Sequence, residues 1–140
     1  MGIMEPRITV ITLGVNDLER AVAFYRNLGF TTEGIVGEDI EYGAVAFFDL
    51  QNGVKLAVWP YESIAHDTSL PIGVHNPTQL TLGHNVNSKQ EVDAVMERAR
   101  EAGAIITKPA HDTAWGGYAG YFQDPDGHVW EVVWNPSLSV

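Results

Sequence analysis

The chain contains no cysteine, and this absence excludes several kinds of protein at once. Disulfide-stapled domains, zinc sites with thiolate ligands and enzymes with a cysteine nucleophile all need that residue. Basic residues are also few, since 8 lysines and arginines stand against 18 aspartates and glutamates, for a formal net charge of −10. Such a chain repels phosphate backbones and anionic lipid, so we expect neither a nucleic-acid nor a membrane partner.

Long apolar runs are missing as well. No stretch approaches the roughly 20 apolar residues of a membrane-spanning helix. The first six residues, MGIMEP, have no basic stretch leading into an apolar core, as a signal peptide has. The chain has 140 residues, 45% of them apolar, which is enough core for a single domain over 1–140. We therefore expect a cytoplasmic protein whose partner is a small molecule.

A weak internal repeat is present. Asn16 recurs as Asn87, and Gly53 recurs as Gly127 at a slightly larger offset along the chain. A longer second helix accounts for the difference between these offsets. The repeat predicts two copies of one unit, joined by a stretch without periodicity that reads as a linker. The first unit covers 7–60, the linker 61–77 and the second unit 78–135.

Each unit reads as a strand, a helix and three further strands. Residues 8–15 are rich in β-branched side chains, and the capping pair Asn16 and Glu19 predicts the start of the helix that follows. In the second unit the pair Ser88 and Glu91 repeats that signal. The other strands are predicted at 31–36, 42–49, 54–59, 104–107, 118–123 and 128–134. An α+β fold of duplicated βαβββ units follows.

Two motifs resemble the vicinal oxygen chelate superfamily, which includes glyoxalase I, extradiol dioxygenases and the bleomycin and fosfomycin resistance proteins. One is the strand and helix start TLGVNDLERAVAFY at 12–25, and the other is DPDGHVWE at 124–131. The resemblance implies that each unit curls a mixed sheet into a cup with its helix outside. It also implies a homodimer.

The resemblance further implies where a metal would bind. Metal-using members place four ligands, typically His or Glu, on the first and last strands of the two units. The matching positions here hold Val10, Ala57, Thr81 and Glu131, and a strand bulge would bring Gln79 in place of Thr81. One strong ligand remains where a divalent ion needs three or four, so we expect no metal and no other cofactor.

Glu131 lies in the middle of a predicted strand, where a carboxylate needs a partner. One interpretation is structural, with Lys55 or a backbone donor as that partner. The other makes Glu131 a general base or the polar anchor of a ligand. Trp59 shares a face with Ala57, and either packs in the core or stacks on a ligand.

The segment 108–117 is predicted as a loop at the rim of the cup. It carries His111, Asp112 and Trp115, and Tyr118 follows directly. These side chains are candidate ligand contacts. The alternative is an ordinary connection in which Asp112 caps its own turn.

The leading hypothesis for function is metal-free binding of a small organic molecule, in the manner of the bleomycin resistance proteins. An enzyme is the alternative: a lyase or isomerase of the glyoxalase type, or a dioxygenase, in which Glu131 acts with or without a divalent metal. A dimerising module with a vestigial cup is a third interpretation. The predicted ligand pocket consists of Val10, Ala57, Trp59, Thr81, His111, Trp115, Tyr118 and Glu131.

Overall fold

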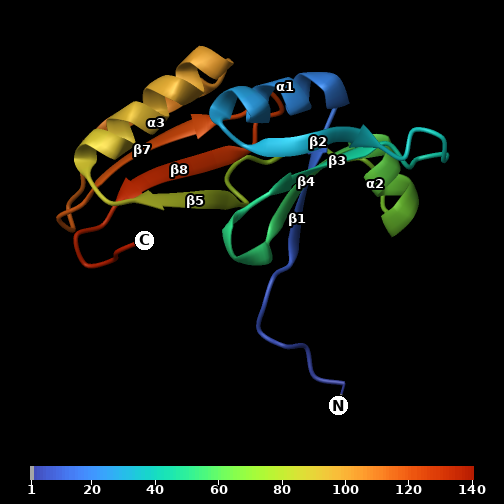
Figure 1. The fold of residues 1–140 in the computed structure, drawn as a ribbon, viewed down its shortest axis with the longest axis horizontal. Coiled ribbons are helices and arrows are strands. Elements are labelled where there is room, and N and C mark those ends of the chain that lie inside the picture. The colour runs from blue at the N-terminus through green and yellow to red at the C-terminus, as the bar shows by residue number, and fades with distance from the viewer. Residues whose placement is uncertain (1) are drawn as a thin grey trace. The chain divides into compact units, whose positions relative to one another are not determined.

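The computed structural model describes residues 2–140, which form two four-stranded mixed sheets and three α-helices (Figure 1). This confirms the predicted α+β class and the duplicated arrangement of elements. The helices are α1 (Leu18–Leu28), α2 (Tyr61–Thr68) and α3 (Lys89–Ala102). Within residues 2–140 no helix is long and apolar enough to cross a membrane.

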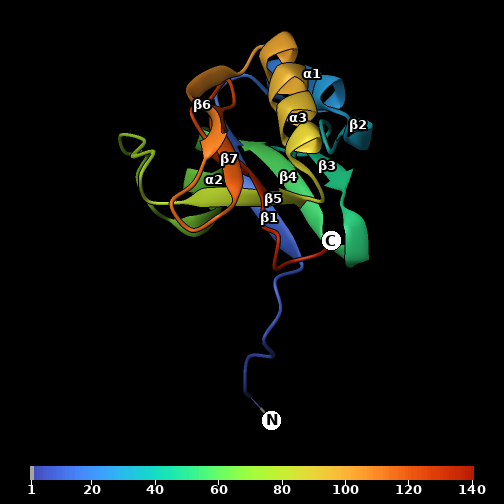
Figure 2. The same cartoon turned by 90° about the vertical axis from the view of Figure 1, so that its left-hand side faces the viewer.

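The first sheet has the strand order β1-β4-β3-β2. β1 runs parallel to β4, and the other neighbours are antiparallel. A 3-10 turn over Gln51–Gly53 closes the β3–β4 hairpin. Ahead of β1 the chain forms an extended segment that leads away from the strand (Figure 2). The strands are β1 (Val10–Val15), β2 (Thr31–Val36), β3 (Val45–Asp49) and β4 (Lys55–Pro60).

The second sheet repeats that topology in the order β5-β8-β7-β6, with β5 parallel to β8. Helix α3 runs along one face of this sheet (Figure 1). The strands are β5 (Thr81–Val86), β6 (Ile105–Asp112), β7 (Tyr118–Gln123) and β8 (Val129–Trp134).

The two sheets have the same internal register. Phe47 of β3 pairs with Ala57 of β4, and at the equivalent positions of the second sheet Tyr121 of β7 pairs with Glu131 of β8. The parallel pairs also correspond throughout, from Val10 and Lys55 in the first sheet to Thr81 and Val129 in the second. The weak repeat in the sequence therefore marks structurally equivalent positions.

The two long helices begin at side-chain caps. Asp17, and not Asn16 as predicted, is the residue before α1, and its Oδ1 accepts a hydrogen bond from the Arg20 amide at 3.1 Å. At α3 the predicted pair is confirmed, because Ser88 Oγ accepts from the Glu91 amide at 3.1 Å. Such caps satisfy amides that have no partner within the helix.

The DPDG turn of the second unit is built around Asp124, which is only 2% exposed. Its Oδ1 accepts from the amides of Asp126 and His128, each at 2.9 Å. Its Oδ2 accepts from the Tyr25 hydroxyl at 2.5 Å, and that hydroxyl in turn accepts from the Trp130 indole at 3.1 Å. The DPDG motif therefore has a structural role, since it closes a hairpin and anchors the last turns of α1.

By their contacts the residues form two compact units, and their border does not coincide with the sequence repeat. The first unit holds the residues up to Val22 together with Phe30–Ile72. The second holds Ala23–Gly29 and Gly73–Val140. The last turns of α1 belong with the second unit because their aromatic side chains pack beside β7 and β8.

Helix α2 lies within the segment interpreted as a linker, where no helix was predicted. The helix is only eight residues long, which is too short for a clear helical periodicity in the sequence. It also lacks a side-chain cap, so no capping signal marks its start. Its first residue, Tyr61, packs where a side chain on Gly14 would lie: a Cβ there would come 2.4 Å from the ring. Gly14 of β1 thus makes room for α2.

Candidate functional site

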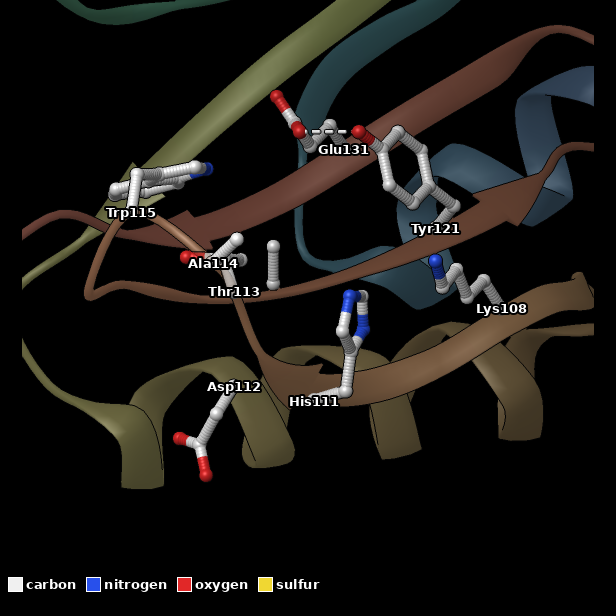
Figure 3. Close-up of a pocket in the computed structure, with 9 residues that line it drawn as sticks. Lys108, His111, Asp112, Thr113, Ala114, Trp115, Tyr121 and Glu131 are labelled. Carbon is white, nitrogen blue, oxygen red and sulfur yellow. Dashed lines mark hydrogen bonds between the residues drawn. The ribbon is translucent and has the colours of Figure 1, made fainter.

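A pocket of about 250 Å³ opens on the second sheet, on the face away from α3 (Figure 3). Gly120 of β7 packs against Met96 of α3, so alternation along the strand turns Ala119 and Tyr121 to the opposite face. That face, with the loop between β6 and β7, forms the pocket. Its lining residues are Lys108, His111, Asp112, Thr113, Ala114, Trp115, Ala119, Tyr121 and Glu131.

Three polar side chains stand in one row across the sheet. Lys108 of β6 pairs with Tyr121 of β7, which pairs with Glu131 of β8. The next residue in the row, on β5, is Gly83, which has no side chain. The row therefore offers an ammonium group at one end, a phenol in the middle and a carboxylate beside an open position.

The Tyr121 hydroxyl donates a hydrogen bond to Glu131 Oε2. This bond, followed by desolvation and the negative charge of Glu131, raises the pKa of Tyr121 above its ordinary value. The phenol therefore keeps its proton at neutral pH and holds the carboxylate in place. Within residues 2–140 no group donates a hydrogen bond to the other oxygen, Oε1, which stays open to a ligand.

The predicted partner of Glu131 was wrong. Lys55 forms an ion pair with Asp49 inside the first sheet, where the two residues are directly opposite on β3 and β4. Among the described residues no backbone amide donates to Glu131 either, and the Tyr121 phenol holds the carboxylate. The register of β7 against β8 explains the difference, because it places Tyr121 directly opposite Glu131.

His111 lines the pocket, but it lies on a strand and not on a loop. β6 continues to Asp112, through two shifts of register that flank Lys108. A proline within the strand is tolerated because β6 is an edge strand with bulges. His111 Nδ1 lies 3.1 Å from the Pro109 carbonyl oxygen, which can only accept, so Nδ1 carries a proton and Nε2 is left for another partner.

Two of the predicted contacts are directed to α3 instead. Asp112 points away from the pocket in Figure 3 and pairs with Lys89 of α3 at 2.8 Å, so it does not cap its own turn. The Tyr118 hydroxyl donates to Asp93 of α3 at 2.7 Å, and this bond raises the pKa of Tyr118. Tyr118 is not among the lining residues.

Trp115 stands at one end of the pocket, in the loop after β6, and is 56% exposed. Its ring lies over Gly117: a Cβ added there would come 2.2 Å from two ring carbons. The glycine thus provides the space in which this indole rests, and much of the ring remains accessible to a ligand.

The other predicted pocket residues are not among those that line this pocket. Val10, Ala57 and Trp59 belong to the first sheet, where Ala57 is 1% exposed and the Trp59 indole donates to the Tyr42 carbonyl at 3.1 Å. Thr81 opens β5 opposite Val129, and Gln79 precedes that strand. A separate pocket of about 340 Å³ lies on the first sheet, lined by Thr32, Glu33, Gly34, Val36, Phe47, Asp49 and Lys55.

The residues present do not fit a metal of the kind that the family resemblance implies. Valine and alanine carry no donor atom at Val10 and Ala57, and Glu131 is already engaged by a phenol. Within residues 2–140 there is no group of three His, Asp or Glu side chains placed to hold an ion.

Comparison with known proteins identifies the family. A family model described as glyoxalase/bleomycin resistance protein/dioxygenase superfamily matches residues 7–132. The chain therefore belongs to this superfamily, and the resemblance seen in the two motifs is confirmed.

Solved structures agree. A glyoxalase-related enzyme from Fulvimarina pelagi is 34% identical, with 94% of this chain and 90% of that chain covered and a TM-score of 0.81. A glyoxalase/bleomycin resistance protein/dioxygenase from Nocardioides is 30% identical, with 94% and 85% covered and a TM-score of 0.74. A fosfomycin resistance protein from Listeria monocytogenes, at 24% identity, 92% and 90% coverage and a TM-score of 0.66, shares the fold.

Proposed function

We propose that the pocket on the second sheet binds a small organic molecule without a bound metal, with Glu131 as its polar anchor. The hydrogen bond from Tyr121 to Glu131 carries the proposal. A carboxylate fixed by one donor, with its second oxygen facing a pocket, can orient a ligand at little entropic cost.

The proposed site keeps His111, Trp115 and Glu131 from the sequence prediction and adds Lys108 and Tyr121. Trp115 supplies a flat apolar surface, and the other four supply polar contacts. An indole with a few placed polar groups is typical of sites for small molecules.

Catalysis by the same pair is a second candidate function. Glu131 would take a proton from a carbon next to a carbonyl group, and the Tyr121 phenol would donate a hydrogen bond to the carboxylate or to the substrate oxygen. The similarity to a glyoxalase-related enzyme at 34% identity favours this alternative. An isomerase or lyase would be the class of enzyme.

A thermal-shift screen of neutral, cationic and acidic small molecules tests binding, because a ligand of the native state raises the melting temperature. For a ligand that raises the melting temperature of the wild type, Glu131→Gln should increase the Kd by at least about tenfold, because a charge-assisted hydrogen bond is lost. Glu33→Gln, on the first sheet, is the matched control and should leave that Kd unchanged. Unchanged binding to Glu131→Gln would reject Glu131 as the anchor.

A further inference from the structure

We infer that the pocket on the second sheet takes a small aromatic acid, whose carboxylate meets Lys108 and whose hydrogen-bond donor meets Glu131. This inference rests on the proposed binding function and names the chemical class of its ligand. It differs from what the net charge of −10 suggests, which is a neutral or cationic ligand.

Lys108 is the group that would bind the carboxylate of an acid. The chain has three lysines, and each of the other two has a carboxylate partner: Lys55 pairs with Asp49, and Lys89 with Asp112. Lys108 has no such partner within residues 2–140, although it lines a pocket in a strongly acidic chain. Lys108 is exposed at the pocket, so its ammonium group is available to bind a carboxylate of the ligand.

His111 adds a hydrogen-bond acceptor to the same pocket. Its Nδ1–H is directed to the Pro109 carbonyl, which fixes the ring and leaves Nε2 as an acceptor for a donor group of the ligand (Figure 3). The shift of register between Lys108 and His111 brings both side chains to the pocket, although they are three positions apart on an edge strand.

The spacing of the row suits a molecule with one ring. Lys108 and Glu131 are separated by the single strand that carries Tyr121. Two strand spacings place their Cα atoms roughly 10 Å apart. The neighbouring position on β7 that faces the pocket is the small Ala119, which leaves room beside Tyr121. A ring with an acid at one end and a donor at the other can bridge the two charged side chains, and Trp115 offers it a flat surface.

The equivalent row of the first sheet lacks the groups that would bind an acid. Its residues at the positions of Tyr121 and Glu131 are Phe47 and Ala57, which carry neither a donor nor a charge. Its lysine in the pocket is already paired with Asp49. The acid-binding arrangement is therefore specific to the second sheet.

The probe is 4-hydroxybenzoate, compared with its uncharged methyl ester by titration of backbone amide NMR signals at constant ionic strength. Both carry the hydroxyl that would meet Glu131, and only the acid carries the charge that would meet Lys108. In the wild type the acid should bind at least about tenfold more tightly than the ester. Lys108→Met should remove this preference, whereas Lys89→Met, at a paired lysine on α3, should keep it.

Glu131→Gln should weaken the acid and the ester by a similar factor, because both lose the same acceptor. Thermal melts of each variant show that it is folded. Equal affinity for acid and ester in the wild type, or an acid preference that survives Lys108→Met, would overturn the inference. Failure of both probes to shift the pocket amides would overturn it too. If the ester alone binds and depends on Glu131, the proposed function stands and the acid class is wrong.

Discussion

The Tyr121 hydroxyl and the Glu131 carboxylate are hydrogen-bonded across neighbouring strands of the second sheet. At the equivalent positions of the first sheet stand Phe47 and Ala57. Two copies of one unit thus share a backbone register, and at this pair of positions their chemistry differs. This difference is the reason to place a ligand site on the second sheet.

The first prediction concerns the titration of Tyr121. Its pKa is raised chiefly by the hydrogen bond to Glu131, with further contributions from desolvation and from the charge of that carboxylate. Glu131→Gln removes the charge and weakens the acceptor, so the pKa of Tyr121 should fall toward its ordinary value. An NMR titration of the tyrosine ring carbons measures this.

Tyr118 is the internal control for that titration, because its raised pKa has Asp93 as its main cause. Its titration should be unchanged in Glu131→Gln. If the Tyr121 pKa stayed where it was in that variant, the hydrogen bond would not hold the pair together.

The second prediction concerns stability. Tyr25→Phe removes a buried hydroxyl that donates to Asp124 and accepts from Trp130. Loss of these bonds leaves buried polar atoms without partners and should lower the free energy of unfolding by about 1–3 kcal/mol. Tyr42→Phe, at an exposed tyrosine, should change it by less than about 0.5 kcal/mol. Denaturant unfolding at pH 7 provides the measurement.

The contribution of Tyr25 should also depend on pH. Burial, followed by the charge of Asp124 and the hydrogen bond to it, raises the pKa of Tyr25 well above its ordinary value. The contribution is therefore complete below about pH 10, where the unfolded tyrosine is still protonated. It declines as the pH rises from there toward the folded pKa, because the unfolded state loses its proton first. A gap between wild type and Tyr25→Phe that widens above about pH 10 would contradict this.

The third prediction concerns metal content. With Val10, Ala57 and Thr81 at three of the four ligand positions, protein purified without added metal should carry no stoichiometric nickel, zinc, iron or manganese. Elemental analysis checks this. One ion per chain that is lost in Glu131→Gln would show that the pocket is a metal site after all.

The fourth prediction concerns the packing of the Trp115 ring against Gly117. Gly117→Ala would place a Cβ 2.2 Å from two ring carbons of Trp115 and 2.7 Å from the Trp134 carbonyl oxygen. The indole must move, and the fold should lose about 1–3 kcal/mol. Gly83→Ala is the control, because its Cβ would meet no atom closer than 4.0 Å. The indole NMR signal of Trp115 should shift in the first variant and remain in the second.

Most of the fold could be predicted because the repeat includes turn glycines and helix caps, which determine the local backbone conformation. Gly53 and Gly127 both adopt a positive φ at the ends of their hairpin turns. Ser88 caps its helix as the pattern indicates. These signals are local, so a single sequence reveals them. Helix α2 was missed because so short a helix carries too little periodicity.

The site was harder to predict because it depends on register and on bulges. Counting back from the turn at 124–127 places Tyr121 opposite Glu131, so the central pair could have been found from the hairpin alone. Lys108 could not be found in this way, since two shifts of register in β6 decide which of its side chains reach the pocket. The direction of Asp112 and Tyr118 toward α3 depends on packing that the sequence does not display.

The most direct test of the account is to map a bound molecule onto the two sheets. A small molecule that raises the melting temperature is titrated into isotope-labelled protein, and the amide signals are followed to saturation. The largest shifts should cluster on the strands and loop from Lys108 to Glu131, and in Glu131→Gln they should need at least about tenfold more ligand to reach saturation. Saturable shifts centred on the pocket of the first sheet, around Phe47 and Lys55, would contradict it.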